Sequence, residues 1–283
     1  MNKFELLQKI TEKKEFSQLP KKDVELAFSH FEKREVGDEE KIKLTRELLH
    51  KVFGAFTSQK LLSPKNKNEE WILRKHLSTR ERLDYYPELY KKLLANYKNK
   101  KISIVDLGAG VNGFSYKYFL KNTTYLGIEA VGQLVNLMNF YFKKSPRDDS
   151  SKDDSPRDDS GEPPAVPSGE PKKLNAKAIH ESLFELEKIK KIITEAKKPK
   201  IIFLFKVLDS LEMLERDYSK KLLLGIVSLV DRVVVSFATR SMIRKKEFKA
   251  KRNWILDFIR ENFKILDDFE IGGERYICFE KRD

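Results

Sequence analysis

Residues 105–113 read VDLGAGVNG, and Gly108, Gly110 and Gly113 give them a complete G-x-G-x-x-G spacing. The apolar residues before the first glycine are typical of a buried strand, so the glycines predict a tight turn from that strand into a helix. Such a turn lets a nucleotide approach the backbone, and an acid about 20 residues later binds the ribose hydroxyls. Glu129, nineteen residues after Gly110, supplies that acid. The spacing therefore predicts a Rossmann-like sheet that binds an adenosine-containing cofactor.

NAD and S-adenosylmethionine (AdoMet) both bind to this geometry, and two features of the chain favour AdoMet. Asp106 lies two residues before Gly108, where a carboxylate can hold the ammonium group of the methionine part. Near the C-terminus, the apolar stretches 263–271 and 275–281 flank two adjacent glycines and predict an antiparallel hairpin. That hairpin resembles the end of the AdoMet methyltransferase sheet. An NAD-dependent oxidoreductase is the alternative from a different class.

The rest of the sequence indicates an α/β chain in two parts. Residues 1–98 carry apolar residues at helical spacing and no strand pattern, so we expect an all-helical N-terminal domain. Residues 99–283 alternate strands with helices, which favours a mostly parallel, Rossmann-like AdoMet methyltransferase sheet that ends in the antiparallel hairpin. The expected strands before the hairpin are 102–108, 125–130, 200–208 and 231–238.

Residues 145–171 differ in composition from everything around them. SPRDDS and SGEP each occur twice, and the segment holds three basic and eight acidic residues with almost no apolar side chains. Such a segment cannot bury enough surface to order itself, so we expect a disordered acidic insert. It joins a helix to the third strand, on the edge of the sheet opposite a ligand crevice, and a long insert there should leave the chemistry intact. A flap that mimics RNA is the functional alternative.

The charge balance favours a polyanionic partner. The chain has 57 Lys and Arg against 44 Asp and Glu, a formal net charge of +13, which rises to +18 without the acidic insert. Lys and Arg release counterions from phosphate backbones, so we expect a nucleic acid as partner. The single cysteine, Cys278, and four scattered histidines indicate neither an internal disulfide nor a metal site. The sequence has no signal-peptide pattern and no membrane-length apolar run, so we expect a cytoplasmic protein without a membrane partner.

Six blocks occur in one order over nearly the whole chain, apart from the insert: LLHKVFGAFTS, HLSTRERL, VDLGAGVNG, FLFKVLDSLE, VVVSFATRS and IGGERYICF. Together they resemble the aminoglycoside-resistance 16S ribosomal RNA guanine-N7 methyltransferases of the FmrO type, which include the ArmA and Rmt enzymes. HLSTRERL and VSFATRS are the specific blocks, because the glycine loop is shared with many unrelated enzymes. The resemblance implies that the N-terminal helices bind ribosomal RNA of the small subunit and that the sheet binds AdoMet.

The resemblance also implies positions for the cofactor residues. Arg82, together with Thr79, is placed near the methionine carboxylate, which a guanidinium can hold through two hydrogen bonds. An ion pair on a helix surface is the alternative for Arg82. Glu181 lies where the family has an acid that accepts from the adenine amino group, although a solvated side chain is the alternative there. The other implied cofactor residues are Asp106, Gly108, Gly110 and Glu129.

Three further residues are candidates for the catalytic end of the site. Lys206 interrupts an apolar strand end, and a buried lysine costs free energy unless it is paired or faces a site. Snorkelling to solvent is the alternative for Lys206. Ser236 and Arg240 resemble the family's segment around the target base, and Arg240 suits an RNA phosphate. The chain departs from the family at Ala238, where proline is usual, and in the basic run 244–252, which replaces a glycine-rich loop.

Guanine N7 carries a free lone pair, so its methylation needs no prior deprotonation and can depend on positioning and electrostatics. This suits a chain without an evident Ser-His-Asp or Cys-His pattern. The resemblance therefore implies AdoMet-dependent methylation of small-subunit ribosomal RNA at guanine N7 of the decoding-site helix. The alternatives are methylation of another RNA or another base atom, the NAD-dependent oxidoreductase, and a non-catalytic RNA-binding protein.

Overall fold

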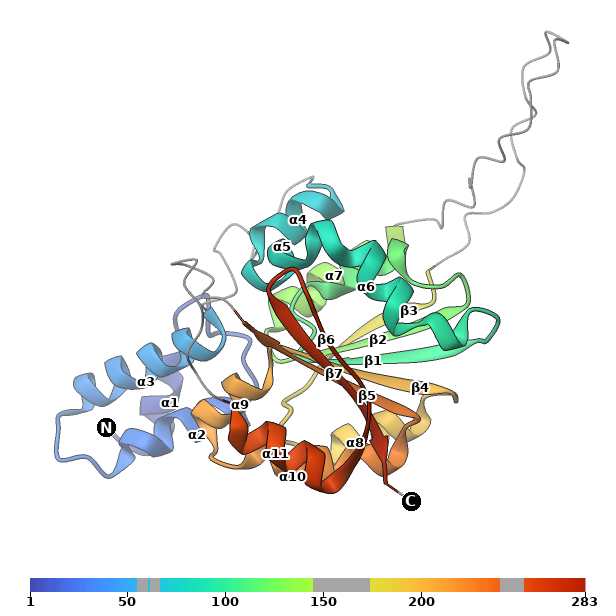
Figure 1. Cartoon of the computed structure of the whole chain (residues 1–283). Helices are drawn as coiled ribbons and strands as arrows, with labels where there is room; N and C mark the ends of the chain where they lie inside the picture. Colours follow the sequence, from blue (N-terminus) through green and yellow to red (C-terminus); the bar gives the residue numbers. More distant parts are fainter. Residues whose placement is uncertain (55–60, 62–66, 145–173, 240–251, 283) are drawn as a thin grey trace, which may run out of the picture.

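The computed structural model describes residues 1–54, 61, 67–144, 174–239 and 252–282. A seven-stranded sheet forms the centre of the molecule, and helices cover both of its faces (Figure 1). The first three helices form a separate layer at one end of the sheet, and this layer holds the N-terminus.

The seven strands are β1 (Ile102–Leu107), β2 (Thr123–Glu129), β3 (Ala176–His180), β4 (Lys200–Phe205), β5 (Arg232–Ala238), β6 (Phe263–Ile271) and β7 (Glu274–Lys281). Their order in the sheet is β3-β2-β1-β4-β5-β7-β6. Strands β1 to β5 pair in parallel, whereas β7 pairs antiparallel with both β5 and β6. The predicted sheet with a terminal antiparallel hairpin is therefore confirmed. The position of the third strand was not predicted, because AKAIH is a short edge strand with little apolar pattern.

Two sets of helices cover the two faces of the sheet (Figure 1). One face carries α4 (Glu69–Lys75), α5 (Leu77–Arg82), α6 (Tyr86–Leu93) and α7 (Gly132–Lys144), with the 3-10 helix η4 (Asn112–Tyr118). The other face carries α8 (Leu186–Glu195), α9 (Leu208–Leu214), α10 (Tyr218–Ile226) and α11 (Asn253–Asn262). Shorter 3-10 helices are η2 (Leu83–Tyr85), η3 (Ala95–Tyr97) and η5 (Val227–Leu229).

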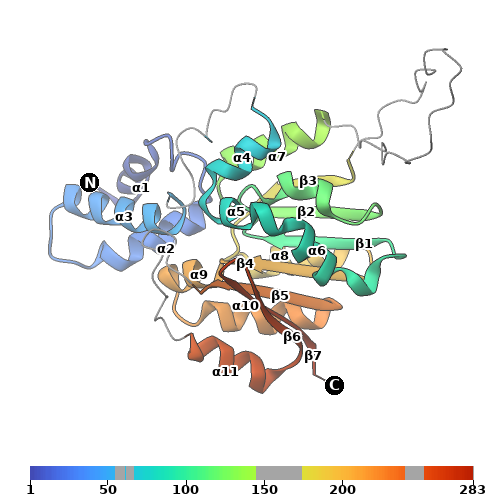
Figure 2. The ribbon, with the colours of Figure 1, turned by 45° about the horizontal axis from the view of Figure 1, so that its top comes forward.

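The N-terminal layer consists of α1 (Lys3–Thr11), α2 (Lys21–Glu32) and α3 (Asp38–Val52), and it docks beside the ends of the central strands (Figure 2). The amide of Gly132 at the start of α7 donates to the carbonyl of Gln18 at 3.2 Å. At the end of α9, the carbonyl of Leu214 lies 2.9 Å from Nε2 of His30. The layer thus bridges helices on both faces of the sheet. Helices α4 to α6 pack over the sheet instead, and a domain boundary at residue 98 stays a prediction.

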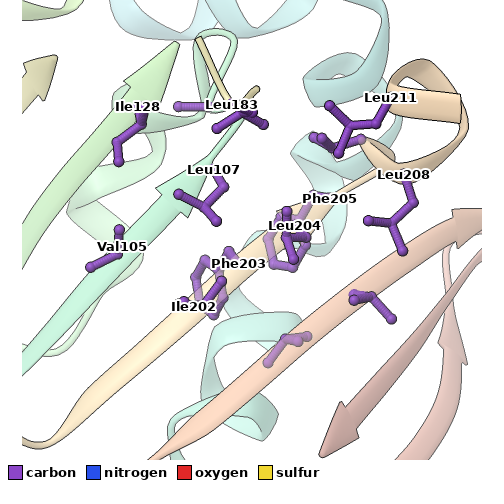
Figure 3. Packing of buried hydrophobic residues seen from close by; sticks show 14 of the residues in the cluster. Val105, Leu107, Ile128, Leu183, Ile202, Phe203, Leu204, Phe205, Leu208 and Leu211 are labelled. Carbon is purple, nitrogen blue, oxygen red and sulfur yellow. The ribbon is translucent and has the colours of Figure 1, made fainter. Parts of the chain in front are cut away.

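The core is built on β1 and β4, whose residues are all buried. Both strands have helices on each side, which explains why they read as continuous apolar runs in the sequence. Figure 3 shows Val105 and Leu107 of β1 beside Ile202 and Leu204 of β4. Burying one such side chain stabilises the fold by about 1.5–3 kcal/mol. This packing holds the carboxyl ends of the central strands rigidly in place.

The hairpin at the C-terminus turns on two glycines. Gly272 and Gly273 have φ angles of 61° and 77°. A two-residue turn with positive φ at both positions matches the right-handed twist of the strands that it joins. Glu274, the first residue of β7, follows this turn and lies opposite Ala238 at the end of β5. The hairpin therefore brings an acidic side chain from the end of the sequence to the ligand edge of the sheet.

Two expectations fall on residues that are not described. The acidic insert 145–171 lies outside the described residues, between α7 and β3 in the chain, and its disorder stays a prediction. Arg240 also lies outside them. Among the helices of the described ranges, none is long and apolar enough to cross a membrane.

Candidate functional site

A pocket of about 840 Å³, part of it open to solvent, lies at the carboxyl ends of β1, β2 and β4. Ligands of open α/β sheets bind at this edge. The wall comes from the turn after β1, the end of β2, the loop after β3, the start of α9 and helix α5. Residues of α2 and α3 close it from the N-terminal layer. The sequence-predicted residues in this wall are Thr79, Arg82, Asp106, Gly108, Gly110, Glu129 and Lys206.

The glycine turn has the conformation that its residues predict. Gly108 and Gly110 have φ angles of 72° and 54°, in the left-handed region that glycine adopts without strain. A Cβ on Gly108 would lie 2.5 Å from a methyl group of Val207, and a Cβ on Gly110 would lie 2.8 Å from the ring of His76. Neither position therefore accepts a side chain, and the backbone of the turn stays open to the pocket.

Glu129 fixes this turn from the end of β2. Its Oε2 accepts a hydrogen bond from the amide of Gly110 at 2.7 Å, and its Oε1 accepts one from the amide of Val131 at 2.8 Å. Burial raises the pKa of Glu129, although the two amides partly oppose that effect. A carboxylate oxygen has more than one lone pair, so both oxygens can still accept from ligand hydroxyls.

Asp106 and Arg82 are linked through one amide side chain. Oδ2 of Asp106 accepts from Nδ2 of Asn112 at 2.8 Å and from the hydroxyl of Tyr125 at 2.8 Å. Oδ1 of Asn112 accepts in turn from Arg82 at 3.1 Å and from the hydroxyl of Tyr86 at 2.7 Å. Burial raises the pKa of Asp106, and these hydrogen bonds oppose the rise. The network orients both charged groups along one wall of the pocket.

Arg82 is 4% exposed and is held on several sides. Its Nε donates to Oε2 of Glu274 at 3.2 Å, another N–H donates to Ser78, and the guanidinium lies 5.0 Å from the ring centroid of Phe205. Burial alone would lower the pKa of Arg82, but Glu274 and three nearby tyrosines outweigh burial and raise the pKa above its usual value, so the guanidinium is charged. Three of its five N–H groups are engaged within the described residues, which leaves donors for a ligand.

Glu274 joins Arg82 to Lys206. Nζ of Lys206 lies 3.0 Å from Oε2 of Glu274 and also contacts Glu81. Burial would raise the pKa of Glu274, but the charges of Arg82 and Lys206 and a hydrogen bond from Ser236 outweigh it and hold the pKa below its usual value. A buried carboxylate thus keeps two cations in place at the pocket wall, and the snorkelling alternative for Lys206 does not hold.

Ser236 and Thr79 serve as supports for this wall. The hydroxyl of Ser236 donates to Glu274 and accepts from the backbone amide of Lys206 at 3.1 Å, and Ser236 is not part of the pocket lining. Lys206 has a φ angle of 58°, unusual for a residue with a side chain, and that amide contact helps to hold it. The hydroxyl of Thr79 donates to the carbonyl of Leu73 at 2.7 Å and fixes the corner between α4 and α5.

Glu181 does not join the pocket. Its Oε1 accepts from the amide of Ser182 at 3.0 Å, and its Oε2 lies 3.4 Å from Nζ of Lys188. The side chain is 20% exposed and is not part of the pocket lining. The structure therefore places Glu181 outside the pocket lining, and its contact with the adenine stays a prediction.

Three residues of the site were not predicted from the sequence: Asp23 and His76, which line the pocket, and Glu274, which lies behind the lining and contacts Arg82 and Lys206. Burial, Arg82 and Lys206 lower the pKa of His76 to about 3, so its ring is neutral at neutral pH. His76 is the first residue of HLSTRERL, and its position just before a helix was the feature of the sequence that could have indicated a place in the site. Asp23 and Glu274 lie in ordinary helix and strand patterns, which carried no such signal. Within the described ranges, no group of three or more His, Cys, Asp or Glu side chains could hold a metal ion.

No protein-family model and no curated protein matches the sequence. Solved structures match it along its length. The 16S rRNA methyltransferase RmtF, solved with S-adenosyl-L-homocysteine, is 17% identical at a TM-score of 0.71, and the match covers 100% of both chains. The 16S rRNA methylase RmtB is 18% identical at a TM-score of 0.68, over 100% of this chain and 99% of RmtB. An rRNA methylase from Escherichia coli is 18% identical at a TM-score of 0.70, over 99% of this chain and 100% of the other. The chain therefore has the fold of these ribosomal RNA methyltransferases, from the N-terminal helices to the final hairpin.

Proposed function

We propose that this chain is an AdoMet-dependent methyltransferase of 16S ribosomal RNA and that it methylates guanine N7 in the decoding-site helix. The observation that carries the proposal is the pocket at the carboxyl edge of the sheet, which combines the glycine turn, Glu129 and Arg82. It occurs in a chain that shares its fold over its full length with RmtF, a 16S rRNA methyltransferase solved with S-adenosyl-L-homocysteine.

The residues of the pocket fit AdoMet from end to end. Arg82 has N–H groups that no described residue accepts and that suit a carboxylate, and Asp106 on the same wall suits an ammonium group. Glu129 beside the glycine turn suits ribose hydroxyls. Ala130 and Leu183 belong to a largely apolar part of the wall that suits a purine ring. When bound, AdoMet supplies a methyl group on a positively charged sulfur, which leaves as a neutral thioether.

Lys206 is the catalytic residue in this proposal. Guanine presents N7 and O6 as neighbouring acceptors, so an ammonium group at the pocket wall can hold O6 while N7 faces the methyl group. Glu81 and Glu274 keep the ammonium in place, and Ser236 holds the backbone of Lys206 as a positioning residue. N7 needs no general base, which fits a pocket whose only histidine, within the described residues, has its pKa lowered to about 3.

The RNA contact of the proposal rests on charge. The formal net charge of +13 includes the strongly negative insert, so the rest of the chain is more basic still. Lysines and arginines of the N-terminal region and of residues 244–252, with Arg240, are proposed to contact phosphates and to fix the register of the RNA. The target base must leave its stack or lie in an irregular part of the helix to reach the pocket.

Ligand binding and methyl transfer test the proposal together. S-adenosyl-L-homocysteine should raise the melting temperature of the purified chain, and NAD should leave it unchanged. Labelled methyl groups should pass from AdoMet to 30S subunits, and neither to 50S subunits nor to bulk tRNA. Protection by NAD alone would support the oxidoreductase alternative instead. Steeply salt-dependent RNA binding with no transfer to any of the three substrates would support a non-catalytic RNA-binding protein.

A further inference from the structure

Asp23 is an acidic residue of the N-terminal layer that lies in the wall of the pocket. It is 2% exposed, although its neighbours Lys21 and Lys22 on α2 are exposed. Ser182, from the loop after β3, forms a hydrogen bond to the carboxyl group. Oδ2 has no hydrogen-bond partner among the described residues. A buried carboxyl oxygen without a partner costs free energy, so its place in a ligand pocket indicates a ligand that supplies a donor.

The surroundings of Asp23 restrict what that ligand group can be. The pocket wall also contains Ala130, Val131 and Leu183, and Leu183 directly follows Ser182, the partner of the carboxyl group, so apolar side chains line this part of the pocket. Figure 3 shows Leu183 at this edge, above the ends of the central strands. A flat ring with a polar edge fits such a place, with its faces on apolar side chains and its edge on the carboxyl group. Glu181, the acid expected at this position, faces Lys188 instead.

We propose that the carboxyl group of Asp23 binds the Watson–Crick edge of the cofactor's adenine, at the 6-amino group and N1; this rests on the proposed function. A neutral carboxyl group has one O–H donor and one carbonyl acceptor. The adenine edge has the complementary pair, because N1 accepts and the amino group donates. Helix α2 of the N-terminal layer then reads the base of the cofactor, while residues of the sheet hold the ribose and the methionine part.

The electrostatic setting of Asp23 favours the neutral form that this pairing uses. Burial is the largest cause, and the charges of Glu129 at the end of β2 and Glu181 after β3 add to it, while Ser182 and the backbone of Asp23 itself oppose it. Together these groups raise the pKa of Asp23 to about 7. The neutral carboxyl group is therefore available near neutral pH, and its O–H is lost as the pH rises.

The test compares S-adenosyl-L-homocysteine with S-nebularinyl-L-homocysteine, which carries a hydrogen atom in place of the 6-amino group. Affinities are measured by calorimetry on the full-length chain. The wild type should bind the adenosyl compound about tenfold or more tightly than the nebularinyl compound, because the latter lacks the amino donor and leaves one buried carboxyl oxygen unpaired. Asp23→Ala should lose about tenfold in affinity for the adenosyl compound and most of the preference between the two. Glu25→Ala, a carboxylate removed two residues along α2, is the matched control and should retain both.

Asp23→Asn keeps the proposal testable if Asp23→Ala folds poorly. An amide has a donor and an acceptor at all pH values, so this variant should bind the adenosyl compound as well as the wild type at pH 6. Between pH 6 and pH 9 the wild type should lose affinity, whereas Asp23→Asn should lose less over the same range. The role of Asp23 would be overturned if Asp23→Ala bound S-adenosyl-L-homocysteine as tightly as the wild type with the same preference between the two compounds, and if Asp23→Asn had the pH profile of the wild type. That result would leave the proposed function standing. No binding by the wild type would overturn the proposed function as well.

Discussion

Glu274→Gln tests whether the buried charge cluster at the pocket wall has the energetic role that its geometry indicates. Glu274 is 1% exposed at its side chain and faces Arg82 at 3.2 Å and Lys206 at 3.0 Å. Glutamine has nearly the same shape, so the substitution removes the negative charge and leaves two buried cations. Lys206 keeps Glu81 as a partner, but Arg82 keeps only neutral ones among the described residues.

Removing one partner of a buried ion pair costs about 3–5 kcal/mol, and the neutral oxygen of glutamine places this substitution near the lower end. For a chain of this size, about 3 kcal/mol corresponds to a fall of roughly 6–12 °C in melting temperature. Urea unfolding at pH 7 measures the free energy directly. Glu280→Gln on the same strand is the matched control, because Glu280 pairs with exposed Lys264 at 2.8 Å. That surface pair should contribute less than about 1 kcal/mol.

The pH dependence of the same variant sharpens the test. The pKa of Glu274 is lower in the folded chain than its ordinary value of 4.5. Its contribution to the free energy of unfolding is therefore fully present above about pH 4.5 and is lost as the pH falls through the folded-state pKa. The difference between wild type and Glu274→Gln should narrow in that acidic range. Equal stability of Glu274→Gln and Glu280→Gln at pH 7 would refute the reasoning.

Three further predictions concern the pocket. Gly108→Ala should destabilise the fold by about 1–2 kcal/mol or more and weaken S-adenosyl-L-homocysteine binding, because alanine at this position must adopt a positive φ and its Cβ meets Val207. The control is Gly37→Ala, whose Cβ would have nothing within 4 Å and which should change the binding little. Urea unfolding measures the stability of both variants, and calorimetry measures their binding. His76 should titrate near pH 3 when its ring is followed by NMR. Its contribution to the free energy of unfolding is therefore present above pH 6.5 and is lost as the pH falls toward 3. A titration midpoint near pH 6.5 would contradict the burial of the ring. Arg82→Lys should keep the charge but weaken S-adenosyl-L-homocysteine binding about tenfold, because an ammonium cannot reproduce the forked hydrogen bonds; wild-type affinity would remove Arg82 from the cofactor site.

The parts of the site that depend on local spacing followed from the sequence. The glycine turn and Glu129 belong to one unit of β1, the turn, η4 and β2, and the hydrogen bond from Gly110 to Glu129 spans only nineteen residues. The hairpin likewise followed from two adjacent glycines between apolar stretches. Periodicity and turn chemistry carry this information because the interacting residues are close in the chain.

The contacts that could not be predicted join distant segments. Glu274 is 192 residues from Arg82, and nothing in IGGERYICF or HLSTRERL indicates that the two meet. Asp23 lies in an amphipathic helix whose pattern predicts a solvated charge, and only the docking of the N-terminal layer buries it. Glu181 was expected to face the adenine, but the chain direction after β3 turns it toward Lys188. Tertiary packing decides such positions, and a single sequence does not encode them in a readable pattern.

The proposed function depends most directly on where the methyl group goes. The measurement is transfer of labelled methyl from AdoMet to purified 30S subunits, followed by borohydride reduction and aniline cleavage of the extracted 16S ribosomal RNA, which breaks the strand at N7-methylguanosine. We predict label in 30S subunits and one cleavage at a guanosine of the decoding-site helix, with neither signal from Lys206→Ala. Label confined to tRNA or 50S subunits, or label in 16S ribosomal RNA without aniline cleavage, would contradict the proposed target.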